Sequence, residues 1–198
     1  SWCWGFSPIA QALVEQAQAA GVELHLVVGG LRTGNGAALE PAARRYILEH
    51  WQAVANATGQ PFTFEGALPD GFVYDCEPAC RAVVAARSLA PDCAWALLKL
   101  IQQAFYVQGR DVTQASVLVE LAERAGLPRI EFAAAFDSAE QYGATAADFT
   151  WVQDLGIAGF PTLLAERNGQ LALLTNGYQS LEPLSDLLGR WLERAASV

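Results

Sequence analysis

The sequence contains no methionine, only two histidines and only four cysteines among its 198 residues. Four cysteines are too few for a disulfide-stapled scaffold, and a chain of this length can bury enough surface to fold without such staples. Hydrophobic residues make up 53% of the chain, yet no apolar run approaches the ~18 residues of a membrane span. We therefore expect a globular protein of one large domain, or of a small domain with an insertion.

Basic residues are scarce as well: 12 Lys and Arg stand against 21 Asp and Glu, which gives a formal net charge of −9. Nucleic acids and anionic membrane surfaces both favour a basic protein surface, so we expect neither as a partner. His25 and His50 belong to no metal-binding spacing such as His-Glu-x-x-His. We therefore predict no metal and no other cofactor.

The periodicity of the chain predicts the order helix, strand, several helices, hairpin, helix. A run rich in β-branched residues at 22–28 is typical of a strand. Asn168-Gly169 between two apolar runs is a strong hairpin signal. A final amphipathic helix follows the hairpin. The other predicted helices cover residues 8–20, 40–58, 77–89, 92–108, 114–125, 129–136 and 138–155.

Cys3 precedes the first predicted helix, which is expected to begin near Pro8. The helix dipole and free backbone N–H groups acidify a thiol in that place, toward pKa values of roughly 3.5–7.5. A free cysteine is more often a small buried apolar residue. From position alone, a reactive thiol and a packed thiol are therefore both open.

The residues around Cys3 favour the reactive thiol. Residues 1–8, Ser-Trp-Cys-Trp-Gly-Phe-Ser-Pro, resemble the segment after the first cysteine of Cys-x-x-Cys in FrnE-type members of the DsbA family, in the thioredoxin superfamily. Residues 156–162, Gly-Ile-Ala-Gly-Phe-Pro-Thr, resemble the cis-proline loop of that superfamily. Because further FrnE-like segments occur in between, the resemblance covers essentially the whole chain; these segments are 28–32, 50–51, 59–62, 74–82 and 103–106.

The resemblance implies an α/β fold: a thioredoxin-like core with a helical insertion domain. The core would comprise residues 1–38 and 137–198, and the insertion residues 39–136. The first core strand is missing from the sequence given and is expected upstream, between the 22–28 strand and the 161–166 strand. Cys3 would then be the second, resolving cysteine of the motif, and the nucleophilic cysteine would directly precede Ser1.

The implied activity is thiol–disulfide exchange on cysteine-containing proteins or small thiols, in the cytoplasm. Pro161 would be cis and close to Cys3, and the Phe160 backbone would pair with an extended substrate. Four residues are predicted to bind substrate: Trp2, Trp4, Phe160 and Thr162. Trp2 and Trp4 are also compatible with a place in the core.

Cys76 and Cys80 stand at the start of a predicted helix, with Asp75 as the expected cap. Their i, i+4 spacing places the Cβ atoms about 5–6 Å apart, whereas a disulfide needs roughly 3.8 Å. A bridge would therefore require Cys76 to lie outside the regular helix. The pair is either a second redox centre or one capping-turn thiol and one packed thiol, and Cys93 is predicted to be structural.

Two alternative functions stay open. One is a glutathione-dependent isomerase or transferase resembling 2-hydroxychromene-2-carboxylate isomerase, a group that shares the fold but typically carries Ser where this chain has Cys3. The other is a redox-inactive module that only binds peptides. Cys3 favours redox chemistry over the isomerase alternative.

Overall fold

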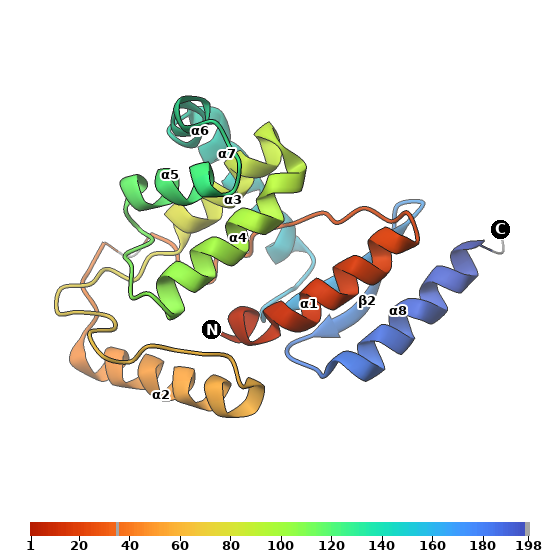
Figure 1. Cartoon of the computed structure of the whole chain (residues 1–198), viewed down its shortest axis with the longest axis horizontal. Coiled ribbons are helices and arrows are strands. Elements are labelled where there is room, and N and C mark those ends of the chain that lie inside the picture. The colour runs from red at the N-terminus through yellow and green to blue at the C-terminus, as the bar shows by residue number, and fades with distance from the viewer. Residues whose placement is uncertain (35, 197–198) are drawn as a thin grey trace.

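The computed structural model describes residues 1–34 and 36–196. Within them the chain forms eight α-helices and one two-stranded sheet (Figure 1). The elements in chain order are α1 (Trp2–Ala19), α2 (Pro41–Thr58), α3 (Glu77–Leu89), α4 (Pro91–Tyr106), α5 (Ala115–Arg124), α6 (Arg129–Phe136), α7 (Ala139–Asp154), β1 (Thr162–Arg167), β2 (Gln170–Asn176) and α8 (Leu181–Ala196). The predicted helices from α2 onward are confirmed to within a few residues.

The first helix begins earlier than the sequence predicts, at Trp2, so that Pro8 lies inside it. A proline in a helix cannot donate to the carbonyl four residues before it, here that of Trp4. The Gln60 side chain donates to this carbonyl instead, at 3.0 Å. A partner distant in sequence thus satisfies the group that Pro8 leaves open, which is why the helix continues through the proline.

The predicted strand at 22–28 is wrong as a strand, since residues 22–30 have no regular secondary structure. Side chains hold this segment. The Val28 N–H donates to the Asp148 carboxylate at 3.0 Å, and the Leu26 carbonyl accepts from the Arg87 guanidinium. A strand needs a backbone ladder with a neighbour, and no strand pairs with residues 22–30 within 1–34 and 36–196.

The predicted hairpin is confirmed. β1 and β2 pair antiparallel from Thr162–Asn176 to Arg167–Gln170, with an irregularity between Leu163 and Leu164. Both turn residues have positive φ, 52° at Asn168 and 77° at Gly169, as a tight hairpin turn of type I′ requires. The hairpin packs with α1 and α8 around one apolar core, which contains Phe6, Leu13, Ala165, Leu174, Leu184 and Leu188.

A second and larger core lies among α3, α4, α5 and α6, and α7 packs against α3 and α6. In Figure 1 these helices form one group, while α1, the hairpin and α8 form another, with the N-terminus between them. A third cluster surrounds Trp51 of α2, a fully buried side chain. The arrangement of helices around a small sheet fits the predicted α/β class, whereas the predicted boundaries 1–38, 39–136 and 137–198 stay a prediction.

Candidate active site around Cys3

Cys3 lies in the first turn of α1, not ahead of the helix. Ser1 is the N-cap, and its carbonyl accepts the first helical hydrogen bond, from the Gly5 N–H at 3.0 Å. The Cys3 side chain is exposed, and none of the four cysteines is in a disulfide. The structure thus presents an exposed thiol at a helix N-terminus, where a substrate disulfide can reach it.

The expected acidification of Cys3 is wrong. The pKa of its thiol is raised, because desolvation by the surrounding protein outweighs the effect of the backbone N–H. Exposure at the surface does not prevent this, since the sulfur still has many protein atoms around it. Cys3 therefore stays protonated at neutral pH, which suits a thiol that reacts second and not the thiolate that attacks first.

The two tryptophans beside Cys3 have different surroundings. Trp2 is half-buried and its ring contacts the rings of His50, at 6.0 Å, and Tyr178, at 5.5 Å. Trp4 is buried, and its indole N–H donates to the Pro61 carbonyl at 2.9 Å. Trp4 thus takes the place in the core that the sequence also allows, whereas Trp2 stays partly exposed and its substrate role remains a prediction.

The Phe160–Pro161 peptide bond is cis, as predicted. Pro161 is buried, and its carbonyl accepts from the Gly177 N–H at 2.7 Å. The next residue, Tyr178, is the one that contacts Trp2. Residues 177–178 therefore connect the proline loop to the first turn of α1.

Phe160 and Thr162 both stabilise the proline loop. The Phe160 ring packs against Gly29, so closely that a Cβ on Gly29 would lie 2.0 Å from the ring. The Thr162 hydroxyl donates to the Gly159 carbonyl at 2.8 Å. The Phe160 backbone makes no hydrogen bond with the described residues, so it is available for an extended peptide.

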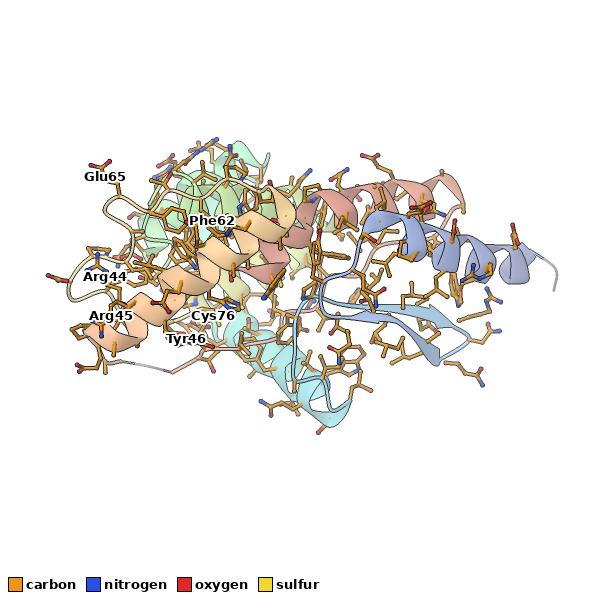
Figure 2. The ribbon with its side chains drawn as sticks, turned by 90° about the horizontal axis from the view of Figure 1, so that it is seen from below. Arg44, Arg45, Tyr46, Phe62, Glu65 and Cys76 are labelled. Atoms are coloured by element: carbon orange, nitrogen blue, oxygen red, sulfur yellow. The ribbon has the colours of Figure 1, made fainter. Side chains whose placement is uncertain are left out.

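Cys76 and Cys80 lie together at the N-terminus of α3, and both are half-buried. The expected cap is confirmed in part: Cys76 is the N-cap, and the neighbouring Asp75 carboxylate accepts from the Glu77 N–H at 2.9 Å. Figure 2 labels Cys76 in the same region of the view as Arg45 and Tyr46 of α2. Cys93 lies against the helical core, as predicted.

Two tyrosines, to which the sequence pattern assigns no role, connect the surroundings of Cys3 to those of Cys76. Tyr106 stacks on Trp4 at 6.2 Å and is hydrogen-bonded to Tyr74. Burial raises the pKa of Tyr106 well above its ordinary value, and a thiolate at Cys3 or at Cys76 would raise it further. Nothing in the local pattern marks these tyrosines, because their common neighbourhood arises only when α4 packs beside residue 74.

The fold and these residues define a class of protein. A model of the DSBA-like thioredoxin domain matches residues 1–189, and the chain belongs to this family. A candidate protein disulfide isomerase from Nitrosomonas europaea is similar at 42% identity, with a TM-score of 0.88 over 98% of this chain and 93% of that one. The cytosolic disulfide reductase DsbM from Pseudomonas aeruginosa is 34% identical, with a TM-score of 0.78 over 99% and 93%.

A second DsbM structure and two further proteins are also similar to this chain. DsbM was also solved with GSH, and that structure is 32% identical to this chain with a TM-score of 0.77. A 2-hydroxychromene-2-carboxylate isomerase is 18% identical with a TM-score of 0.63, which shows the fold alone. The ClpXP adapter protein SpxH of Halalkalibacterium halodurans is 25% identical over 166 residues, and the chain spans about half (54%) of its length.

Among residues 1–34 and 36–196, no helix is both long and apolar enough to cross a bilayer. The same residues contain no group of three or more His, Cys, Asp or Glu side chains that could hold a metal ion.

Proposed function

We propose that this protein catalyses thiol–disulfide exchange, with Cys3 as the resolving thiol of a Cys-x-x-Cys dithiol. The observation that carries the proposal is the exposed Cys3 thiol in the first turn of α1, whose neighbour Trp2 contacts Tyr178 next to the loop that holds Pro161. The likeness to a disulfide reductase at 34% identity and to a candidate disulfide isomerase at 42% supports it.

The attacking cysteine is expected directly before Ser1. Its thiolate attacks one sulfur of a substrate disulfide, breaks the S–S bond and forms a mixed disulfide, while the other substrate sulfur leaves as a thiol. Cys3 then loses its proton and attacks the attacking cysteine's own sulfur, which releases the second substrate thiol. Two electrons pass to the substrate and leave a disulfide between the attacking cysteine and Cys3, and two molecules of a small thiol such as glutathione restore the protein dithiol and become one disulfide.

The surroundings of Cys3 favour cysteine-containing peptides or small thiols as substrates. Trp2 and Tyr178 offer an aromatic surface beside the thiol, and the free Phe160 backbone offers a pairing edge for an extended chain. The solved complex of DsbM with GSH supports glutathione as the small thiol. The likeness to a cytosolic reductase supports a cytoplasmic location.

The test is Cys3→Ser in the protein with its native residue before Ser1. Loss of the resolving thiol should leave mixed disulfides that survive on a non-reducing gel and vanish with reductant, while Cys93→Ser should leave none. Absence of adducts together with full activity would make Cys3 structural. A residue other than cysteine before Ser1 in the gene would instead favour the redox-inactive peptide-binding module.

A further inference from the structure

Cys76 and Cys80 form a second thiol pair, which the exchange reaction at Cys3 does not use. Cys76 is the N-cap of α3, with φ −92° and ψ −6°, and the regular helix begins only at Glu77. Its backbone keeps the αR conformation, and the Cys80 N–H donates to its carbonyl at 2.9 Å. Closing a disulfide therefore requires the backbone at Cys76 to shift, and Cys76, at the boundary of the helix, has no preceding helical turn to hold it.

Backbone groups of the preceding loop hold both sulfur atoms. The Arg32 N–H donates to Cys76 Sγ at 3.3 Å, and the Arg32 carbonyl accepts from the Cys76 N–H at 2.8 Å. The Gly30 N–H donates to the sulfur of Cys80. Both cysteines are therefore fixed against residues 30–32, and backbone N–H donors of this kind stabilise a thiolate.

The two thiols also contact each other. The Cys80 thiol donates a hydrogen bond to the Cys76 sulfur, and this bond lowers the pKa of Cys76 against the effect of its burial. The same bond and burial raise the pKa of Cys80 well above its ordinary value. The contact therefore distinguishes one sulfur that deprotonates readily from one that keeps its proton.

We propose that Cys76 and Cys80 are a second redox centre that closes reversibly to a disulfide, with Cys76 as the attacking sulfur and a low-molecular-weight disulfide such as glutathione disulfide as the oxidant. The contact between the two thiols and the Arg32 N–H on Cys76 carry this assignment. It does not depend on the activity proposed for Cys3.

The reaction takes two exchange steps. The Cys76 thiolate attacks one sulfur of glutathione disulfide, which breaks that S–S bond, forms a Cys76–glutathione mixed disulfide and releases one glutathione thiolate. Cys80 then loses its proton and attacks Cys76 Sγ, forming the Cys76–Cys80 bond and releasing the second glutathione. The protein loses two electrons and two protons, and glutathione disulfide becomes two glutathione molecules.

Tryptic digestion after the reaction makes the redox state of Cys76 and Cys80 in the whole protein measurable. No Lys or Arg lies between Arg45 and Arg81, so both cysteines fall in one peptide, residues 46–81, apart from Cys3 and Cys93. The protein is equilibrated in glutathione buffers from fully reduced to fully oxidised, quenched with acid, alkylated and digested. We expect peptide 46–81 to change from doubly alkylated to unalkylated and lighter by two hydrogens, reversibly.

Three variants test the assigned roles. Cys80→Ser should accumulate glutathione on Cys76, because the resolving sulfur is gone, whereas Cys76→Ser should leave Cys80 largely unmodified. Cys93→Ser is the matched control and should leave oxidation of peptide 46–81 unchanged. Circular dichroism checks that each variant folds, and the wild-type mapping decides the proposal even if one of them does not.

Two results would overturn the proposal. One is peptide 46–81 that stays doubly alkylated in excess glutathione disulfide, and the other is a wild-type glutathione adduct that never closes. The reaction at Cys3 is measured separately, from the Cys3→Ser adducts and from the tryptic peptide that contains Cys3 and ends at Arg32. A protein that turns over no substrate but still forms the Cys76–Cys80 disulfide would therefore contradict the proposed function and still support the second redox centre.

Discussion

Gly29 lies directly against the ring of Phe160: a Cβ at position 29 would be 2.0 Å from Phe160 Cζ and 2.2 Å from Cε1. The two residues are far apart in sequence. One belongs to the segment 22–30, and the other directly precedes Pro161. Their contact joins that segment to the proline loop, and only a residue without a side chain permits so close an approach.

We expect Gly29→Ala to lower the free energy of unfolding by about 1–3 kcal/mol, the usual cost of overpacking a filled site. Urea unfolding followed by tryptophan fluorescence measures it. Gly143→Ala is the matched control, because Gly143 lies in α7 with open space around it. That change should stabilise the protein by roughly 0.5–1 kcal/mol through helix propensity.

The cause of the Gly29→Ala effect is tested by adding Phe160→Ala. If the clash is with the ring, removing the ring should abolish most of the extra cost, so the two changes will not add. An unchanged cost in the double variant would contradict a clash with Phe160.

The Arg87–Asp148 ion pair is expected to contribute more to stability than the exposed Arg129–Glu123 pair. Two guanidinium–carboxylate bonds of 2.9 and 3.0 Å join the first pair, and its two residues together satisfy the Leu26 carbonyl and the Val28 N–H. Arg87→Ala should lower the free energy of unfolding by about 1–3 kcal/mol, because partly buried backbone and carboxylate groups lose their partner.

The matched control is Arg129→Ala. The Arg129–Glu123 pair has a similar distance, 3.0 Å, but both side chains are 54% exposed, so its loss should cost only about 0–1 kcal/mol. If Arg87→Ala and Arg129→Ala lower the free energy of unfolding equally in urea, the hydrogen bonds to residues 26–28 add nothing to stability.

Trp2 and Trp4 should respond in opposite ways to truncation. Trp4→Ala removes a buried, hydrogen-bonded side chain and should destabilise the fold by about 3–5 kcal/mol. Trp2→Ala should leave the fold in place but weaken turnover of a disulfide-containing peptide. Thermal unfolding and a fluorescent peptide-disulfide assay separate the two. Full peptide turnover in folded Trp2→Ala protein would contradict a substrate role for Trp2.

Cys76 should react with iodoacetamide at lower pH than Cys80. The hydrogen bond from Cys80 lowers the pKa of Cys76, and the same bond raises that of Cys80. Since only the thiolate is alkylated, the rate at Cys76 should level off below the pH at which a free thiol such as N-acetylcysteine does. Cys80 should react only above that pH.

The rates can be read from Cys76→Ala and Cys80→Ala proteins and from brief labelling of the wild type, followed by digestion. The alanine variants remove the hydrogen bond between the two side chains, so the difference between the two sites should shrink in them. Faster alkylation of Cys80 than of Cys76 in the wild type would contradict the assigned directions.

The sequence by itself determined the local features of this protein. Periodicity placed α2 to α8, because an amphipathic helix repeats its apolar residues every three or four positions. Asn168-Gly169 specified the hairpin turn, since both residues adopt positive φ readily. The residues around Cys3 and Pro161 indicated the family, and the family model over residues 1–189 confirmed it.

Tertiary structure decided what depends on a distant partner. Gln60 accounts for a helix that continues through Pro8, and Arg87 and Asp148 hold the backbone at Leu26 and Val28 without a strand ladder. Desolvation raises the pKa of Cys3, against the expectation from its helix position. A helix or turn arises from neighbours in sequence, but burial, solvation and hydrogen-bond partners depend on residues that only folding brings together.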